Sequence, residues 1–473
     1  MNIQRQVPST SFFDIQKGPL WLNTTASRKI NESIQENFFM FSNKHKIFKV
    51  KTLHLQNHFI FKRKKNGQNQ IADILNATIC EVEQPNYGAG IRITKSGQTI
   101  EIYGMTIIWL QQLRFFCIQQ DFASKYSIIR LLGKGTFGKV YKIKSRITQQ
   151  DFAVKVFDKK AICKYQDYQL IIKELQIIRN LNHPGIIKFF ETYENDDHIF
   201  LIYEMVEQGE LYALIKERYL SEDESLLIIK QLLQAVLYIH SKGILHRDLK
   251  PSNLLLRDRN TLSVAIADFG LAEFYRVDGK YIYTRCGTPG YVAPEILQDK
   301  IYDYKIDIYS AGVILFMMLS GGKSPFNKTD PEEKLFQNYK SQIDYSLVSN
   351  TSEATYNLLQ SMLEPDSTKR ISAKAALNHQ VFRNQRGSKC TILIKKTPKS
   401  IDKISHPRLI INTNNNLDKY LQLSPKLQNI PQKPQNNMKQ EAIRRGFQKL
   451  QTFSHRSPQL SPLQSQTKFE PFP

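Results

Sequence analysis

A short run of residues, positions 246–253, holds the side chains of this chain that are best suited to chemistry. The run reads His-Arg-Asp-Leu-Lys-Pro-Ser-Asn, and Asp268-Phe269-Gly270 begins 15 residues after Asn253. Asp248 can take the proton of a hydroxyl group, and Lys250 adds a cation beside that carboxylate. The amide of Asn253 and the carboxylate of Asp268 offer oxygen atoms of the kind that bind Mg²⁺. This set suits phosphoryl transfer, because that reaction needs positioned phosphates, metal ions and an oriented nucleophile.

A glycine-rich segment further upstream is suited to holding phosphates. It reads Gly133-Lys134-Gly135-Thr136-Phe137-Gly138-Lys139-Val140, and the apolar stretches on either side, residues 128–132 and 140–143, predict strands. Glycines let backbone amides approach phosphate oxygens closely. A dinucleotide-binding turn has the same glycine spacing, but it leads into a helix, whereas residues 139–144 have the pattern of a strand. The segment therefore indicates a phosphate-binding loop between two strands.

Taken in order, these motifs resemble those of a eukaryotic protein kinase over residues 126–382. Ala153-Val154-Lys155 follows the glycine-rich segment, and Glu174 lies in a stretch of helical periodicity. The ordered set carries the resemblance, since any one motif could arise by chance. The resemblance implies an α+β, two-lobed fold with a small β-rich lobe and a large helical lobe.

The resemblance also implies the cofactors ATP and Mg²⁺ and a role for each matching residue. Lys155, fixed by Glu174, would hold the α- and β-phosphates, although an isolated helical glutamate is more often a surface charge. Asp248 would orient the substrate hydroxyl and Lys250 would steady the γ-phosphate, while the Mg²⁺ ligands would be Asn253 and Asp268. The other residues expected around the nucleotide are Gly133, Lys134, Gly135, Thr136, Phe137, Gly138, Val140, Ala153, Glu204, Val206, Glu210 and Leu255.

The type of kinase follows from residues near Asp248. A lysine two residues after this aspartate is typical of kinases that act on serine and threonine, and Lys250 stands there. Residues 287–295 are most similar to the calcium/calmodulin-dependent group. Protein substrates with serine or threonine acceptors are therefore expected. The alternative is a catalytically inactive scaffold that acts by lipid or protein binding, but the residues that inactive relatives usually lose are all present.

An activation segment is expected over residues 268–295. Within it, Thr288 would hydrogen-bond toward Asp248 and Lys250. Glu295 at its end would pair with Arg370 and lock the large lobe.

Arg247, directly before the catalytic aspartate, is a cation that usually needs an anion from the activation segment. A phosphate on Thr284 is the first candidate for this anion, because phosphorylation adds charge that arginine can pair with. Tyr281 and Tyr283 are weaker candidates. An unmodified segment, with Arg247 held by other groups, is the alternative.

Length and composition bound the number of domains and the compartment. At about 150 residues per domain, the 473 residues predict two or three domains. Apolar residues make up 41% of the chain, which is enough for sizeable cores, but no apolar run reaches the roughly 18 residues of a membrane span. The chain begins without an apolar signal region, and its five cysteines are scattered without a Cys-x-x-Cys pair. We therefore expect a cytoplasmic monomer without disulfides or structural zinc.

The net charge of +23 is concentrated at the two ends of the chain. Residues 1–120 have a net charge of +8 and residues 384–473 have +12, which leaves +3 for residues 121–383. Basic ends favour anionic membrane surfaces, nucleic acid or acidic partners; solvated charge that only aids solubility is the alternative. No recognition motif supports nucleic acid, so we expect none to be bound.

The region before the kinase-like segment divides in two. Residues 1–35 are polar and predict a flexible N-terminal arm. Residues 36–122 show short apolar runs, hairpin-like turns at Asn66-Gly67 and Ser96-Gly97, and then a helical stretch over residues 105–120 that includes Trp109. This pattern resembles a pleckstrin-homology (PH) domain, a small β-barrel-like fold closed by a helix. The family often binds phosphoinositides through basic residues between its first strands, so the resemblance implies peripheral attachment to membranes.

Several lysines and an arginine lie in the matching region of this chain: Lys44, Lys46, Lys49, Lys51, Lys62, Arg63, Lys64 and Lys65. The alternative is a small β-rich domain whose charges only face water.

The C-terminal segment, residues 384–473, is rich in Asn, Gln, Pro, Ser and Lys. Such a composition buries too little apolar surface to offset chain entropy, so a basic, disordered tail of low complexity is expected. Within it, residues 439–453 place apolar side chains at helical spacing with basic residues between them. That stretch resembles a calmodulin target or a membrane-surface helix. An incidental pattern in a basic tail is the alternative.

Overall fold

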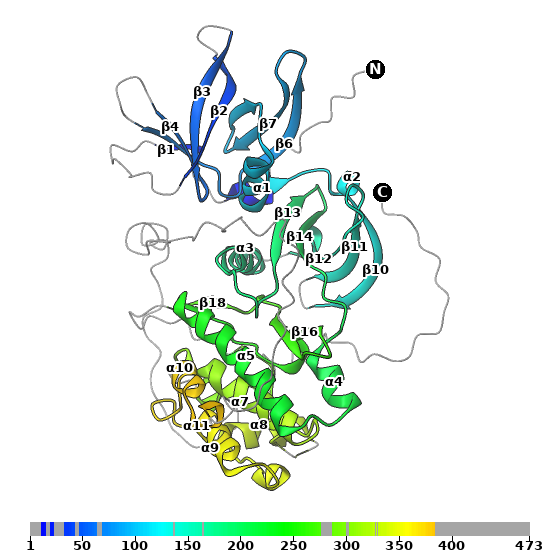
Figure 1. Ribbon diagram of the computed structural model, residues 1–473, viewed down its shortest axis with the longest axis vertical. Coiled ribbons are helices and arrows are strands. Elements are labelled where there is room, and N and C mark those ends of the chain that lie inside the picture. The colour runs from blue at the N-terminus through cyan, green and yellow to red at the C-terminus, as the bar shows by residue number, and fades with distance from the viewer. Residues whose placement is uncertain are drawn as a thin grey trace, which may run out of the picture.

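The computed structural model describes residues 11–15, 19–22, 33–42, 47–63, 69–135, 138–162, 165–275, 286–298, 302–326, 328 and 330–383. An N-terminal domain lies above a β-rich small lobe, which in turn lies above a helical large lobe (Figure 1). Thr136, Phe137 and Thr284, together with the tail 384–473 and its segment 439–453, lie outside the described residues.

The N-terminal domain consists of two antiparallel groups of strands followed by a helix. The first group, in the spatial order β1-β5-β4-β3-β2, continues into the second, β8-β7-β6, through a pairing of Phe39 with Tyr103. Its elements are β1 (Trp21–Leu22), β2 (Ile34–Ser42), β3 (Ile47–Gln56), β4 (Phe59–Arg63), β5 (Asn69–Asp73), β6 (Thr78–Gln84), β7 (Gly88–Lys95), β8 (Gln98–Tyr103) and α1 (Ile107–Phe116).

Two of the sequence patterns in this domain explain its local structure. Ser96 and Gly97 both have positive φ values, 49° and 74°, and form the tight turn between β7 and β8 that the sequence predicted. Helix α1 begins two residues later than the predicted stretch and buries Trp109 and Leu113 completely. The Trp109 ring meets Phe38 of β2 edge-on, with 4.6 Å between the ring centroids, so α1 closes the core of this domain.

The prediction of a flexible arm over residues 1–35 is wrong for two short segments. Phe12–Ile15 forms a 3-10 turn, η1, in which Phe13 is buried. Further along, Leu20 is fully buried and β1 pairs with β5. Polar neighbours hid these few apolar side chains in the sequence, and burying them is what orders the segments.

The small lobe continues the same sheet. Its order is β13-β14-β12-β11-β10, and the two-residue strand β9 pairs in parallel with both β6 and β13, so that the strands β1 to β14 are joined. The elements are β9 (Ile118–Gln119), α2 (Phe122–Lys125), β10 (Tyr126–Lys134), β11 (Lys139–Ser145), β12 (Asp151–Asp158), η2 (Lys159–Ala161), α3 (Tyr165–Arg179), β13 (Phe189–Glu194) and β14 (His198–Glu204).

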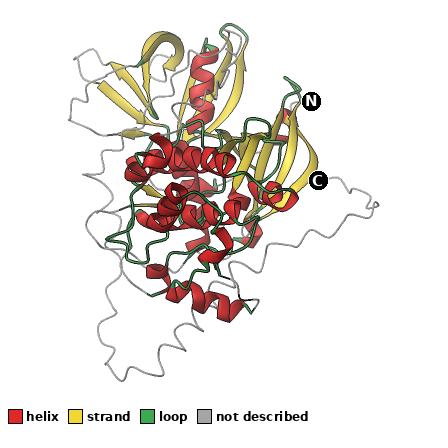
Figure 2. Ribbon diagram, turned by 60° about the horizontal axis from the view of Figure 1, so that its bottom comes forward, coloured by secondary structure: helices red, strands yellow, loops and turns green. Residues whose placement is uncertain are grey.

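Helices make up most of the large lobe, as Figure 2 shows. Helix α7 lies at its centre, with every side chain from Ile306 to Met318 buried. The elements are α4 (Leu211–Glu217), α5 (Glu222–Ser241), β15 (Ile244–Leu245), η3 (Pro251–Asn253), β16 (Leu254–Asp258), β17 (Ser263–Ile266), β18 (Glu273–Phe274), α6 (Pro294–Leu297), α7 (Lys305–Leu319), α8 (Pro331–Lys340), η4 (Tyr345–Val348), α9 (Glu353–Met362), α10 (Ala373–Leu377) and α11 (Gln380–Arg383).

A buried ion pair ties the end of the activation segment to the rest of this lobe. Arg370 donates to both carboxylate oxygens of Glu295, at 2.6 and 2.9 Å, and both side chains are almost completely buried. The sequence predicted this pair. None of the described helices is long and apolar enough to cross a membrane.

Candidate active site

The residues predicted to hold phosphates meet in a cluster of three charges. Lys155 on β12 donates to both oxygens of Glu174 on α3, at 2.7 and 3.0 Å. The same ammonium lies 3.1 Å from Oδ1 of Asp268, which follows β17. The structure therefore contains the predicted pair of Lys155 and Glu174, and it brings the expected metal ligand Asp268 to the same lysine.

The electrostatics of this cluster favour a fixed cation next to an ionised Asp268. The attraction of Lys155 outweighs burial and lowers the pKa of Asp268 to about 2. Burial works against the ammonium of Lys155, but the carboxylates of Asp268 and Glu174 together raise its pKa. Burial raises the pKa of Glu174, and Lys155 only partly offsets that effect.

Two further residues support the cluster and had no such role in the sequence reasoning. Tyr203 of β14 interacts electrostatically with Glu174, whereas sequence reasoning assigned this side chain only a position behind the adenine. At Gly270, an added Cβ would lie 3.2 to 3.5 Å from Asp268, Glu174 and Lys155. A side chain at position 270 would therefore crowd all three charged groups.

The second cluster surrounds Asp248. Thr288 donates to Oδ1 of Asp248 at 2.7 Å, Lys250 donates to the Thr288 hydroxyl at 2.9 Å, and Lys250 lies 2.9 Å from Oδ2 of Asp248. Asn253 donates to the backbone oxygen of Asp248 at 2.8 Å. The predicted contacts of Thr288 are thus present, and they connect the catalytic loop to the activation segment.

The backbone around this cluster is held in an uncommon conformation. Arg247 and Asp268 have φ values of 66° and 59°, in the left-handed region that costs energy for residues other than glycine. Asp307 of α7 stabilises the backbone conformation at Arg247, because its carboxylate accepts from the backbone amides of His246 and Arg247, both at 2.9 Å. Sequence reasoning gave Asp307 no such role; its pattern, an acidic residue at the start of an apolar helix, is too common to signal one.

Arg247 already has a carboxylate near it. Its Nε donates to the Leu271 backbone oxygen at 2.7 Å, and its Nη2 lies 3.5 Å from Oε2 of Glu273. The same Glu273 oxygen accepts from Lys173 of α3 at 2.5 Å. Glu273 therefore links the catalytic loop to α3, and sequence reasoning missed it. The described residues thus supply an anion for Arg247, while the predicted phosphate acceptor Thr284 lies outside them.

The residues expected around the nucleotide lie on adjacent strands and on the link between the lobes. Val140 pairs with Lys155 across β11 and β12, and Ala153 pairs with Tyr203 across β12 and β14. The described glycine-rich residues are Gly133, Lys134 and Gly135 at the end of β10 and just after it, and Gly138 just before β11.

On the link between the lobes, the backbone amide of Glu204 donates to the backbone oxygen of Lys188 at 2.9 Å. The carboxylate of Glu204 forms an ion pair with Arg257. Val206 and Leu255 are partly buried against the main core. Glu210 directly precedes α4 without a side-chain capping bond and forms an isolated antiparallel β-bridge with Leu255. Burial raises the pKa of Glu210.

Packing connects the catalytic loop with Asp268. The ring of His246 lies 4.9 Å from the ring of Phe269 in an edge-on contact, and Phe269 shares the main hydrophobic core with Ile178 of α3. Burial lowers the pKa of His246, and its Nδ1 accepts from the backbone amide of Asp248 at 3.3 Å.

The expected Mg²⁺ ligands fit a metal that receives most of its ligands from phosphate. Asn253 uses its amide nitrogen on Asp248, and its amide oxygen accepts no hydrogen bond from the described residues. Oδ2 of Asp268 likewise has no donor among them. Within the described residues no group of three or more His, Cys, Asp and Glu could hold an ion alone. Two protein oxygens beside bound phosphates are the usual arrangement for Mg²⁺.

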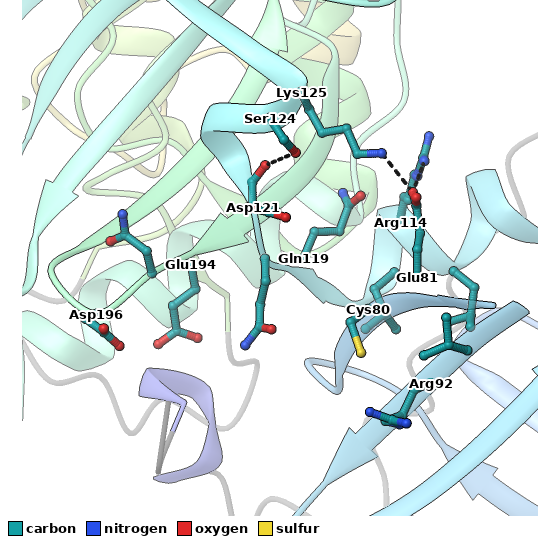
Figure 3. Close-up of a pocket in the computed structure, with 15 residues that line it drawn as sticks. Cys80, Glu81, Arg92, Arg114, Gln119, Asp121, Ser124, Lys125, Glu194 and Asp196 are labelled. Atoms are coloured by element: carbon teal, nitrogen blue, oxygen red, sulfur yellow. Dashed lines mark hydrogen bonds and ion pairs between the residues drawn. The ribbon is translucent and has the colours of Figure 1, made fainter. Parts of the chain in front are cut away.

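One cavity among the described residues lies away from this site. It has a volume of about 500 Å³ and lies where the N-terminal domain meets the small lobe. Figure 3 shows Cys80, Glu81 and Arg92 of the N-terminal domain around it, with Glu194 and Asp196 of the small lobe.

Comparison with known proteins agrees with this geometry. Residues 126–382 match the protein kinase domain family. The chain belongs to this family.

Three relatives show how far the similarity extends. A calcium-dependent protein kinase 3 of Plasmodium berghei is 38% identical over 260 residues, which cover 54% of this chain and 46% of the relative. A probable myosin light chain kinase of Dictyostelium discoideum is 37% identical, covering 54% of this chain and 82% of the relative. The mouse serine/threonine-protein kinase DCLK3 is 36% identical, covering 55% and 33%. The match thus covers only 33% of the mouse relative and 46% of the Plasmodium relative.

Proposed function

We propose that the chain is an ATP-dependent serine/threonine protein kinase that transfers the γ-phosphate of ATP to hydroxyl groups of proteins. The observation that carries this proposal is the joint presence of two clusters, Lys155 with Glu174 and Asp268, and Asp248 with Lys250 and Thr288. The names of the relatives support the same activity. The residues that inactive relatives usually lose are present in the sequence, which supports activity over an inactive scaffold: Lys155, Asp248, Asn253 and Asp268.

Each charged group has one task in this proposal. Lys155 binds the α- and β-phosphates, while Glu174 keeps the ammonium in position. Asp248 accepts or orients the proton of the substrate hydroxyl, and Lys250 stabilises the charge of the phosphate being transferred. Asn253 and Asp268 would hold Mg²⁺, which supplies charge neutralisation on the phosphates when bound.

The identity of the acceptor can be tested directly. The full chain is incubated with Mg²⁺ and ATP and with three peptides that differ only in carrying serine, threonine or tyrosine. Transfer to the serine and threonine peptides, and its loss when the metal is chelated, are expected. Transfer to the tyrosine peptide alone, or equal transfer without metal, would contradict the proposal.

The flanking regions are proposed to control where and when the site works. Two antiparallel groups of strands followed by helix α1 support our proposal that the N-terminal domain is PH-like and binds phosphoinositide membranes, which would place a cytoplasmic enzyme at the membrane surface. The name of the Plasmodium relative favours regulation by calcium, and residues 439–453 are the proposed calmodulin target. Phosphorylation of Thr284 is the proposed activating event.

The proposed membrane binding is tested by co-sedimentation of the full chain with phosphoinositide vesicles, compared with neutral vesicles.

A further inference from the structure

We propose that residues before the kinase domain hold helix α3 at both of its ends and so position Glu174 against Lys155. This inference rests on the proposed function, because α3 carries the glutamate that fixes the phosphate-binding lysine. It assigns the N-terminal region a part in the catalytic unit that is separate from any membrane or partner binding.

The C-terminal end of α3 is held by the N-terminal domain. Arg179, the last residue of the helix, donates from Nη1 to Oδ1 of Asn76 at 2.6 Å. Asn76 lies between β5 and β6 in the left-handed region, with φ of 59°, and its own amide donates to the backbone oxygen of Phe116 in α1. The contact therefore joins α3 to the part of the N-terminal domain where sheet and closing helix meet.

The surroundings of Arg179 make this contact difficult to replace. The side chain is only 5% exposed, and neither Nε nor Nη2 has a hydrogen-bond partner among the described residues. The ring of Phe189 lies 6.0 Å from the guanidinium, and the carbonyl end of α3 favours a cation there. Asn76 is thus the principal hydrogen-bond acceptor of a buried charge, and burying a charge without such an acceptor is costly.

The N-terminal end of α3 is held by the segment around Phe12. The ring of Phe12 lies 4.3 Å from that of Tyr168 in the first turns of α3, and Phe13 is buried in the same core as Tyr168. The Phe12 amide donates to Oε1 of Glu194 at 2.5 Å, and Lys159 lies 2.6 Å from the same oxygen. The segment is thus fixed to the small lobe next to the helix.

Strand pairing and buried hydrogen bonds join the N-terminal domain to the small lobe near these contacts. Strand β9 pairs with β6 of one domain and β13 of the other. Next to it, the buried Glu191 accepts from Gln119 at 2.8 Å and from Tyr126 at 2.5 Å. The cavity of Figure 3 opens beside this joint and is lined in part by Gln119 of β9.

Glu174 lies between the two points at which α3 is held. A shift of the N-terminal domain would move Arg179, and a rigid helix would carry Glu174 with it. Loss of this contact should therefore weaken the binding of ATP while the affinity for the protein substrate stays the same.

The test compares three variants of the full chain. Asn76→Ala removes the acceptor, and Asn76→Asp keeps it. Asn57→Ala is the matched control, because Asn57 is also an asparagine with positive φ, 54°, in the N-terminal domain, and the structure gives it no hydrogen bond to the kinase domain within the described residues. The measurements are the dissociation constant of Mg²⁺-ATP, the peptide KM, and hydrogen exchange in residues 165–179.

We expect Asn76→Ala to weaken ATP binding about tenfold, in line with the loss of a hydrogen bond to a buried charge. It should also speed exchange in α3 and leave the peptide KM unchanged. Asn76→Asp should restore ATP binding to within about threefold of the parent. The inference is overturned if Asn76→Ala and Asn57→Ala behave alike, or if Asn76→Asp is as weak as Asn76→Ala. Binding and exchange need no turnover, so a protein that fails to transfer phosphate would refute the proposed function and still leave this test readable.

Discussion

The kinase domain and the N-terminal domain each bury a lysine against a carboxylate, and the two lysines differ in what surrounds them. Lys155 meets Glu174 and Asp268, which come from a helix and a loop that lie 19 and 113 residues further along the chain. Lys95 lies 3.1 Å from a carboxylate oxygen of Asp73 and donates to the backbone oxygen of the same residue at 3.2 Å. Carboxylates from two different elements converge on the first lysine, whereas one residue, 22 positions away in the chain, meets the second.

This difference indicates that Lys155 belongs to a ligand-binding site, whereas Lys95 has a structural role. Oδ2 of Asp268 has no donor among the described residues and can bind a metal ion, while the ammonium of Lys155 can contact phosphates. The pair at Lys95 satisfies its own hydrogen bonds and leaves little for a ligand. Matched substitutions in the two domains can therefore show whether function or stability depends on each pair.

The largest expected effect is on transfer by Lys155→Met, compared with Lys95→Met. Loss of a positioned phosphate-binding cation should lower kcat/KM by on the order of 10²–10³-fold, while the variant remains folded. Lys95→Met should lower the melting temperature, because Asp73 loses its partner, and keep the rate within about tenfold of the parent. Activity assays and thermal unfolding of both variants make the comparison, and similar rate losses in both would remove the distinction.

The next effect concerns stability, in Arg370→Ala compared with Arg92→Ala. Arg370 and Glu295 are buried, so removing the arginine leaves an unpaired buried carboxylate and should cost about 3–5 kcal/mol of unfolding free energy. Arg92 pairs with Glu101 at 2.6 Å but is 43% exposed, so its loss should cost less than about 1 kcal/mol. Chemical denaturation measures both. Equal losses would show that burial does not decide the strength of these pairs.

The smallest effect is expected for Glu273→Gln, compared with Glu81→Gln. Each glutamate lies between two cations: Glu273 between Lys173 and Arg247, and Glu81 between Arg114 and Lys125. Glu273 joins α3 to the catalytic loop, so its neutralisation should lower kcat about five- to tenfold. Glu81 is 58% exposed, and its neutralisation should change kcat less than about twofold. An unchanged rate for Glu273→Gln would leave Arg247 dependent on an anion from elsewhere, such as a phosphate on Thr284.

The sequence predicted the charged pairs of the kinase domain because their chemistry restricts both residue type and order. Only a carboxylate can serve as Asp248 does, and only certain spacings bring it to Lys250 and Asn253. The pairs of Lys155 with Glu174 and of Glu295 with Arg370 were implied by the resemblance of the ordered motifs to those of protein kinases.

Residues that act through packing or backbone support were not predictable in this way. Asp307 and Glu273 are ordinary acidic residues in their local sequence, and only the tertiary fold brings them to Arg247. Phe12 and Asn76 lie in segments without periodicity, so no pattern indicated that both contact α3. Short apolar runs and turns predicted strands in the N-terminal domain, but its joint with the small lobe depends on β9, a strand of two residues that is too short to leave a pattern.

The central claim is that Asp248 serves phosphate transfer to a serine or threonine hydroxyl. The most direct test is the rate at which the full chain and Asp248→Asn transfer phosphate from Mg²⁺-ATP to a serine peptide under single-turnover conditions. The account predicts transfer by the parent and a rate lower by about 10²–10⁴-fold in the variant, with ATP binding retained. Equal rates in the two proteins, or no transfer by the parent to any serine or threonine peptide, would contradict it.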